Sequence, residues 1–579
     1  MSILERYKDL HVELKNPPAA YRSIPFWSWN DVLKKEELLE QISSMQENGI
    51  GGFFMHSRDG LETEYLGKEW DECVYSCVKK ASELGMEAWL YDEDRWPSGS
   101  CGGRVQKAVG GLKGLTMEVA PFSELHERIK NDDTVLALYS AEISGSSIKQ
   151  FKRLPLTDCV TDCMGQAAGK SAATDDAVAV DAVTDAEHVC LIARLEKSAP
   201  SVWFNDNPPP DNLNPESVKT FLKLTHEHYL NLFGGKFPKS VKGSFSDEES
   251  LHDRHASFNL PYFYFVDCGI SGDGDFAKSA GCVSSTSAAK SAFQAAVEVA
   301  AKSATFGKSS KIRFDYWHNL ALRFEQCYSQ QIGKWCLEHG ISYTGHFLQE
   351  DKMGLCARVN GSIMPHYLHQ SCPGVDLLCE QTDEYMTIKQ CTSVANQFGK
   401  KQVLTETYAA TGWDFSFEGQ KWIGDWQYVL GVNRRCQHLS LYSLRGCRKR
   451  DYPPCFNYNT TWWKKLKVVE DYFARLSYLL TKGNPVRNVL IIHPMSHVWA
   501  SLGCSPYGNP DRNNESGILA MDSFGYEFNA MLKSFCACHI DFDLVDETIL
   551  ERYGKIEDVA FAESDSSGRT CALRSEEHT

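Results

Sequence analysis

The feature that most constrains the fold is a unit that recurs along the chain. Each unit is a short β-prone apolar run, followed by polar or aromatic residues and then by a helix-forming segment. The β-prone runs lie at residues 23–30, 50–56, 87–91, 241–245, 341–346, 375–379, 402–405 and 438–442. Strands that alternate with helices at short intervals indicate parallel βα units. Because a closed (β/α)₈ TIM barrel needs eight of them, this α/β fold is predicted.

One stretch interrupts the repeat. Between residues 113 and 200 the chain carries short alternating segments and an Ala/Asp/Thr-rich run. This pattern predicts a β-rich insertion after the third βα unit. The insertion would lie within a catalytic barrel that spans residues 1–480.

The chain continues beyond the barrel into a different pattern. Residues 488–494 and 542–545 are typical of strands in a second α/β domain, which we expect to begin within 485–570 and to be incomplete. The last residues, 571–579, do not resemble native protein sequence. They are interpreted as a non-native tail on a truncated chain, so the natural protein is expected to be longer.

Glutamates follow three of the predicted barrel strands: Glu248 after the fourth, Glu350 after the fifth and Glu406 after the seventh. Residues just past the strands of such a barrel meet at one mouth. Hydrolysis of a glycosidic bond needs two carboxyl groups flanking the anomeric carbon. One protonates the leaving oxygen, and the other attacks or activates water. We therefore predict that these glutamates are catalytic, although each could instead cap a helix or pair with an arginine.

Aromatic and polar side chains near the same strand ends are predicted to bind the sugar. Sugar rings have apolar C–H faces that stack on aromatic rings, and their hydroxyls pair with polar groups. The predicted substrate-binding residues are Trp27, Trp29, His56, Arg58, Asp92, Asp94, Trp96, His346 and Trp413. Any one tryptophan could instead pack against a barrel helix. Asp92 and Asp94 could form a salt-bridged rim or hold calcium, which prefers several oxygen ligands.

Composition excludes some classes of partner. The formal net charge of −16 argues against nucleic acid as the main partner, since phosphate binding needs a basic surface. No apolar run is long enough to span a membrane, and the amino-terminal residues lack the apolar core of a signal peptide. The chain has 21 cysteines without zinc-type spacing, which favours a reducing cytoplasm. An oligosaccharide or glycoside is the expected partner, and the oligomeric state is not predicted.

Several motifs resemble glycoside hydrolases related to family 106, the family known for α-L-rhamnosidases. They are Pro25 to Asn30, Gly51 to His56, Asp92 to Gly99, Ser246-Asp247-Glu248, Thr344 to His346 with Glu350, and Glu406. They occur as an ordered series over residues 17–480, which is more specific than any single motif. The segment from Asn488 resembles the α/β domain that follows the barrel in β-galactosidase-like enzymes.

The resemblance implies a barrel with a carboxylate pair, no required cofactor and a site that calcium often assists. Within that family Glu248 would be the general acid and Glu350 the base that activates water, which makes the enzyme inverting. A broader analogy among barrel glycosidases pairs Glu248 with Glu406 as nucleophile, which makes it retaining. A carboxyl separation of about 5–5.5 Å indicates retention, and about 6.5–9.5 Å indicates inversion.

Two other functions fit the same residues. A carbohydrate-binding barrel that has lost catalysis would bind saccharide through its tryptophans without hydrolysing it, and strand-end glutamates more than about 10 Å apart would favour it. A metal-dependent aldolase or isomerase would use His56, Asp92, Asp94 and His346 as ligands instead. Metal content and loss of activity with a chelator would distinguish this last class.

Overall fold

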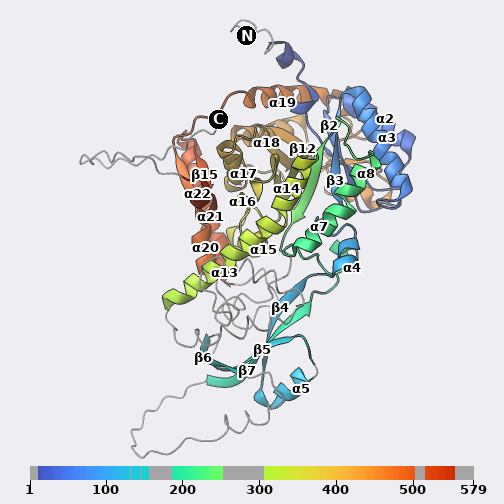
Figure 1. Ribbon diagram of the computed structural model, residues 1–579. Helices are drawn as coiled ribbons and strands as arrows, with labels where there is room; N and C mark the ends of the chain where they lie inside the picture. Colours follow the sequence, from blue (N-terminus) through green and yellow to red (C-terminus); the bar gives the residue numbers. More distant parts are fainter. Residues whose placement is uncertain are drawn as a thin grey trace, which may run out of the picture.

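The computed structural model describes residues 11–130, 132–144, 147–154, 186–251, 306–502 and 516–554. Its centre is a parallel sheet that closes on itself (Figure 1). The strands are β1 (Phe26–Trp29), β2 (Gly52–Ser57), β3 (Glu87–Asp94), β8 (Val241–Glu249), β9 (Ser342–Phe347), β10 (Cys372–Leu377), β11 (Leu404–Thr407), β12 (Arg434–Gln437) and β13 (Ser440–Leu441). They follow the order β12-β11-β10-β9-β8-β3-β2-β1-β13. The predicted (β/α)₈ barrel is confirmed.

The eighth barrel strand is in two pieces, which explains why nine strands make an eight-unit barrel. β12 pairs with β11, whereas β13 pairs with β1. The predicted eighth strand, 438–442, covers only the second piece, so its start was wrong. Two consecutive arginines are not typical of a buried strand, so the first piece was missed. In the structure both are buried and form ion pairs, Arg434 with Glu87 and Arg435 with Glu470 at 2.9 Å.

Helices cover the outside of the barrel. They are α2 (Lys35–Glu47), α3 (Lys68–Leu84), α4 (Arg104–Val109), α7 (Pro215–Leu224), α8 (His226–Leu232), α13 (Phe306–Cys327), α14 (Ser329–Glu338), α15 (Met353–Asn360), α16 (Met364–Tyr367), α17 (Tyr385–Gln397), α18 (Phe417–Val429) and α19 (Lys467–Leu480). Their buried faces follow helical spacing, as in α2, where Leu38, Ile42 and Met45 face the barrel. α3 ends at Gly85 in the left-handed conformation, as its sequence predicts.

Two further sheets lie outside the barrel. Where the β-rich insertion is expected, β4 (Lys113–Ala120), β5 (Val135–Ser144), β6 (Ser147–Leu154) and β7 (Ala186–Lys197) form an antiparallel sheet in the order β4-β7-β5-β6, with α5 (Leu125–Ile129) beside it (Figure 1). The Ala/Asp/Thr-rich run of the insertion falls largely outside the described residues.

The C-terminal segment packs against the barrel helices. β14 (Leu490–His493) and β15 (Asp543–Asp546) pair in parallel, and α20 (Met495–Ser501), α21 (Ser516–Ala537) and α22 (Glu547–Tyr553) accompany them. α20 contacts α13, and α21 contacts α15 (Figure 1). The expected non-native tail, 571–579, lies outside the described residues. None of the described helices is both long and apolar enough to cross a bilayer.

The interior of the barrel is filled by an apolar layer. Its side chains come from most of the strands and include Phe26, Phe54, Trp89, Phe245, Leu404 and Cys436. Because successive side chains of a strand point to opposite faces, the next inward position lies two residues further along. That position is where the polar residues of the mouth begin.

Candidate active site

A polar layer lies above the apolar one at the carboxyl ends of the strands. His56 follows Phe54 at a spacing of two, Asp247 follows Phe245, Glu406 follows Leu404 and His438 follows Cys436. Each of these four polar residues is at most 5% exposed. Strand alternation therefore brings side chains from distant parts of the sequence to one mouth.

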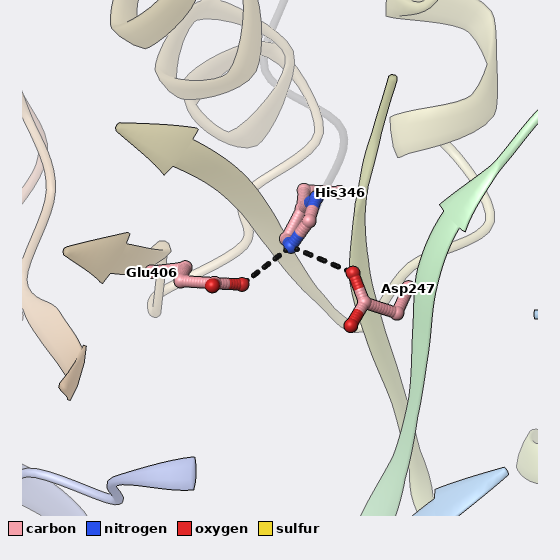
Figure 2. Close-up of side chains that lie close together, drawn as sticks. All are labelled: Asp247, His346 and Glu406. Atoms are coloured by element: carbon pink, nitrogen blue, oxygen red, sulfur yellow. Dashed lines mark hydrogen bonds and ion pairs between the residues drawn. The ribbon is translucent and has the colours of Figure 1, made fainter. Parts of the chain in front are cut away.

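Asp247 and Glu406 of this layer form a cluster with His346 of β9 (Figure 2). His346 Nε2 lies 2.7 Å from Glu406 Oε2 and 3.2 Å from Asp247 Oδ1. The other oxygen of Asp247 accepts a hydrogen bond from the Tyr91 hydroxyl at 2.6 Å. Burial alone would lower the pKa of His346, but the charges of Asp247 and Glu406 outweigh burial and hold that pKa well above its usual value. Figure 2 shows the imidazole of His346 between the carboxyl groups of Asp247 and Glu406.

Glu248 stands next to this cluster at the end of β8. Its φ of +46° turns the chain out of the regular strand, and its side chain remains partly exposed. Burial raises the pKa of Glu248 to about 8, and the negative charges of Asp247 and Glu406 act in the same direction. A carboxyl group of this kind keeps its proton near neutral pH.

Glu350 is held more tightly than the other predicted catalytic residues. Its Oε1 accepts hydrogen bonds from the Phe347 amide at 3.0 Å and the Tyr367 hydroxyl at 2.9 Å. Its Oε2 accepts one from the Asp376 amide at 3.0 Å. Burial raises its pKa to about 7. Both oxygens therefore have fixed partners in the protein.

Asp376 belongs to the same mouth, although the sequence analysis missed it. On β10 it is the register partner of Glu406 on β11. Burial raises the pKa of Asp376 well above its usual value, and the charges of Glu406, Glu248 and Glu350 add to that rise. The charges of all three predicted catalytic glutamates thus raise the pKa of the same carboxyl group, that of Asp376. Inward alternation along β10 was the signal that could have identified it.

The opposite side of the mouth is organised around Arg58. Its guanidinium binds Asp451 through two hydrogen bonds of 2.8 Å, and it also lies 3.1 Å from His56 Nε2 and 3.2 Å from His438 Nε2. Trp96 stacks on the guanidinium, 3.9 Å from its carbon to the ring centroid. Burial and the charge of Arg58 lower the pKa of His438 to about 3 and that of His56 well below its usual value.

Asp92 and Asp94 accept hydrogen bonds from other side chains of the protein. Asp92 is 1% exposed and accepts hydrogen bonds from Ser98 and Ser246. Asp94 accepts them from Ser57 at 2.6 Å and Asn205 at 2.9 Å. Burial raises the pKa of Asp92 well above its usual value. In the described parts of the chain, neither residue belongs to a group of three or more acidic or histidine side chains close enough to hold an ion.

The possible ligand atoms of Asp247, His346 and Glu406 lie close enough to one another to hold a metal ion. Calcium takes six to eight oxygen ligands, whereas this cluster offers two carboxylates and one imidazole whose nitrogen already bonds to both. The cluster by itself does not fit calcium. No step of the chemistry below is assigned to a metal.

The structure does not bring every predicted tryptophan to the mouth. Trp27 and Trp29 are 0% exposed, because their side chains point outward from β1 to the helices. Trp27 donates a hydrogen bond to Gln41 of α2 at 2.8 Å, and Trp29 packs on Trp70 of α3. Their prediction as substrate-binding residues was therefore wrong. Trp413 is 42% exposed in the segment after β11.

Comparison with known proteins adds to this geometry. Residues 329–497 match the model of glycoside hydrolase family 106, alpha-L-rhamnosidase. The fold resembles a rhamnosidase from Novosphingobium sp. PP1Y, with a TM-score of 0.57 and 14% identity over 93% of this chain and 64% of that one. A β-galactosidase from Rahnella sp. R3 aligns with 12% identity over 92% of this chain and 66% of its own, with a TM-score of 0.45.

A sequence match covers a shorter segment. A Formosa agariphila protein described as a beta-glucuronidase is 30% identical over 108 residues, which is 18% of this chain and 9% of that protein. The chain therefore spans only part of the relatives that it matches. The matched segment 329–497 includes Glu350, Asp376 and Glu406. The chain is thus similar to glycoside hydrolase family 106 over residues 329–497, and its barrel has the same fold as the rhamnosidase structure.

Proposed function

We propose that the chain hydrolyses O-glycosidic bonds and that Glu248 is the general acid. The observation that carries this proposal is the position of Glu248 at the mouth end of β8 beside Asp247, where burial and neighbouring charges raise its pKa to about 8. A general acid must hold its proton at the working pH and reach the leaving oxygen. Burial beside two other carboxylates supplies the first condition, and its position at the mouth supplies the second.

We further propose Glu406 as the second carboxylate, in preference to Glu350. The charge of Glu406 is among the main influences on Glu248, whereas the oxygens of Glu350 are already engaged by two backbone amides and a tyrosine hydroxyl. His346 offsets part of the rise in the pKa of Glu406 that burial causes, which favours its ionised form. A catalytic carboxylate of this kind must be ionised to attack C1 or to activate water.

The chemistry follows from these two groups. Glu248 gives its proton to the glycosidic oxygen as the bond from that oxygen to C1 breaks. Glu406 either bonds to C1, or removes a proton from the water that does, and the leaving group departs as an alcohol. If Glu406 forms a covalent intermediate, a later water releases the sugar, with Glu248 taking the proton back.

An α-L-rhamnoside is the proposed substrate class. The matching family model carries the description alpha-L-rhamnosidase, and the Novosphingobium structure is titled a rhamnosidase. The experiment is a panel of 4-nitrophenyl glycosides of rhamnose, galactose, glucuronic acid and arabinose. The rhamnoside should be hydrolysed fastest. Binding of a sugar without any hydrolysis would favour a carbohydrate-binding barrel instead.

Glu248→Gln tests the acid directly. Removal of a general acid typically lowers the rate by about 10²- to 10⁴-fold, and we expect kcat to fall by that factor. Glu406→Gln should lower it at least as much, and Glu350→Gln should lower it less. Glu72→Gln, on the exposed side of α3, is the matched control and should leave kcat unchanged. Undiminished turnover by Glu248→Gln would contradict the assignment.

A further inference from the structure

The β-rich insertion returns to the barrel through a turn that carries an exposed tryptophan. This turn, η3 (Val202–Phe204), lies shortly after β7. Trp203 is 54% exposed, whereas Phe204 beside it is 6% exposed and anchors the turn. An exposed aromatic ring on an anchored turn can be held in one place for a ligand at little cost in conformational entropy.

Hydrogen bonds fix this turn to the rim of the barrel. Asn205 donates to Asp94 at the end of β3, and Asp94 in turn accepts from Ser57 at the end of β2. The Ser201 hydroxyl caps the turn by accepting from the Trp203 amide, and Ser201 pairs with Asn207 through the backbone. The insertion therefore ends at the mouth, where it contributes side chains to the rim.

Trp203 continues a row of contacts that begins at the proposed catalytic group. Arg58 lies 3.1 Å from His56, and the His56 ring contacts that of Tyr91, which donates a hydrogen bond to Asp247 beside Glu248. Trp96 stacks on Arg58, and Trp203 meets the Trp96 ring edge to face at 5.5 Å between centroids. The row leads from the carboxyl groups to Trp203, which is 54% exposed.

The order of the strands around the barrel indicates which side of the substrate these contacts would face. Trp96 follows β3, which pairs with β8, the strand of Glu248. Glu406 lies on β11, which is reached from β8 in the other direction, through β9 and β10. The general acid protonates the leaving group, and the second carboxylate acts on the other face of the anomeric carbon. The β3 side of the mouth is therefore the side toward which the leaving group departs.

We infer that Trp203 and Trp96 form a leaving-group subsite that stacks on a ring-bearing leaving group, and that the insertion thereby sets the specificity of the enzyme. The inference rests on the proposed function, because it takes Glu248 as the acid. A pyranose presents an apolar C–H face and an aryl group presents an aromatic one. Both can stack on indole, so the shared chemistry of the ligand is a ring with an apolar face.

The test compares three glycosides that share the sugar cleaved best: the methyl glycoside, the 4-nitrophenyl glycoside and a disaccharide. Stacking on an aromatic ring contributes about 1 kcal/mol, or roughly a factor of five in affinity. Trp203→Ala should lower kcat/KM for the ring-bearing substrates about five times more than for the methyl glycoside, chiefly through KM. Trp203→Phe should recover part of this difference. Trp422→Ala, a tryptophan 51% exposed on α18, is the matched control and should leave the ratios unchanged.

Each possible result of this comparison either supports or overturns the proposed subsite. A selective loss on the disaccharide identifies a saccharide subsite, a selective loss on the nitrophenyl glycoside identifies an aryl subsite, and a loss on both identifies a general ring platform. An equal loss on all three substrates, or no loss, would overturn the subsite while leaving the proposed hydrolysis standing. A wild-type chain that hydrolyses none of the three would instead overturn the proposed function, and the leaving-group role with it. Circular dichroism of each variant verifies folding.

Discussion

At the scale of single residues, neighbours decide what each ionisable group can do. His346 lies between Asp247 and Glu406, so its pKa is raised, whereas His56 and His438 flank Arg58 and have lowered pKa values. A histidine between the carboxylates thus favours its cationic form, whereas the histidines beside Arg58 favour the neutral form. The carboxylates follow the same rule, because burial and mutual repulsion keep protons on some of them.

The raised pKa of Glu248 predicts how activity depends on pH. The acid works only while protonated, so kcat should fall as pH rises through about 8, the pKa of this carboxyl group. A pH–rate profile of the wild-type chain measures this alkaline limb. Glu72→Gln is again the control and should keep the limb in place. A rate that stays level up to pH 9.5 would contradict Glu248 as the acid.

At the scale of elements, the strands and helices of the barrel were predictable, but the inward face of a strand was not. Parallel strands are covered on both sides, so β1 is buried at every position. Its sequence therefore does not distinguish Phe26, which points inward, from Trp27, which points outward. This is why two tryptophans were misplaced. In β10, where Asp376 is the one charged residue, the alternation that leads inward from Cys372 to Asp376 was present in the sequence.

Gly243 shows how closely neighbouring barrel strands pack. A Cβ atom at this position would lie 2.3 Å from Cζ3 of Trp89 and 2.5 Å from the Ser342 carbonyl oxygen. Gly243→Ala should therefore lower the free energy of unfolding by about 1–3 kcal/mol through overpacking. Urea denaturation followed by tryptophan fluorescence measures it. The neighbouring exposed Lys242 provides the control, since Lys242→Ala should change stability by less than about 0.5 kcal/mol.

At the scale of the whole molecule, the C-terminal segment and the barrel share polar contacts as well as apolar ones. Asp522 of α21 accepts hydrogen bonds from the Gly354 and Leu355 amides at the start of α15, the helix that begins just after Glu350. Lys389 of α17 is 1% exposed and pairs with Asp541 at 3.1 Å. Such contacts join groups more than 150 positions apart, so sequence patterns that predict each part separately gave no account of how the parts meet.

Asp522 supplies the helix cap that α15 lacks within its own segment, where Lys352 makes no side-chain cap. Loss of a capping carboxylate costs about 0.5–2 kcal/mol. Asp522→Ala should therefore increase hydrogen exchange at residues 353–360 more than elsewhere in the barrel. Exposed Glu527 on the same helix gives the control, Glu527→Ala. Unchanged exchange in α15 would show that the cap does not stabilise that helix.

The apolar layer of Phe26, Phe54, Trp89 and Phe245 closes the barrel below the carboxylates. Within the described residues, this layer fills the barrel interior below the carboxyl groups, so a ligand reaches them from the mouth. If the chain hydrolyses glycosides as proposed, both halves of a cleaved glycoside must depart by the route along which the intact molecule arrived. The half that sits nearer the rim has to clear that route before the deeper half can follow, so the order of product release is built into the architecture.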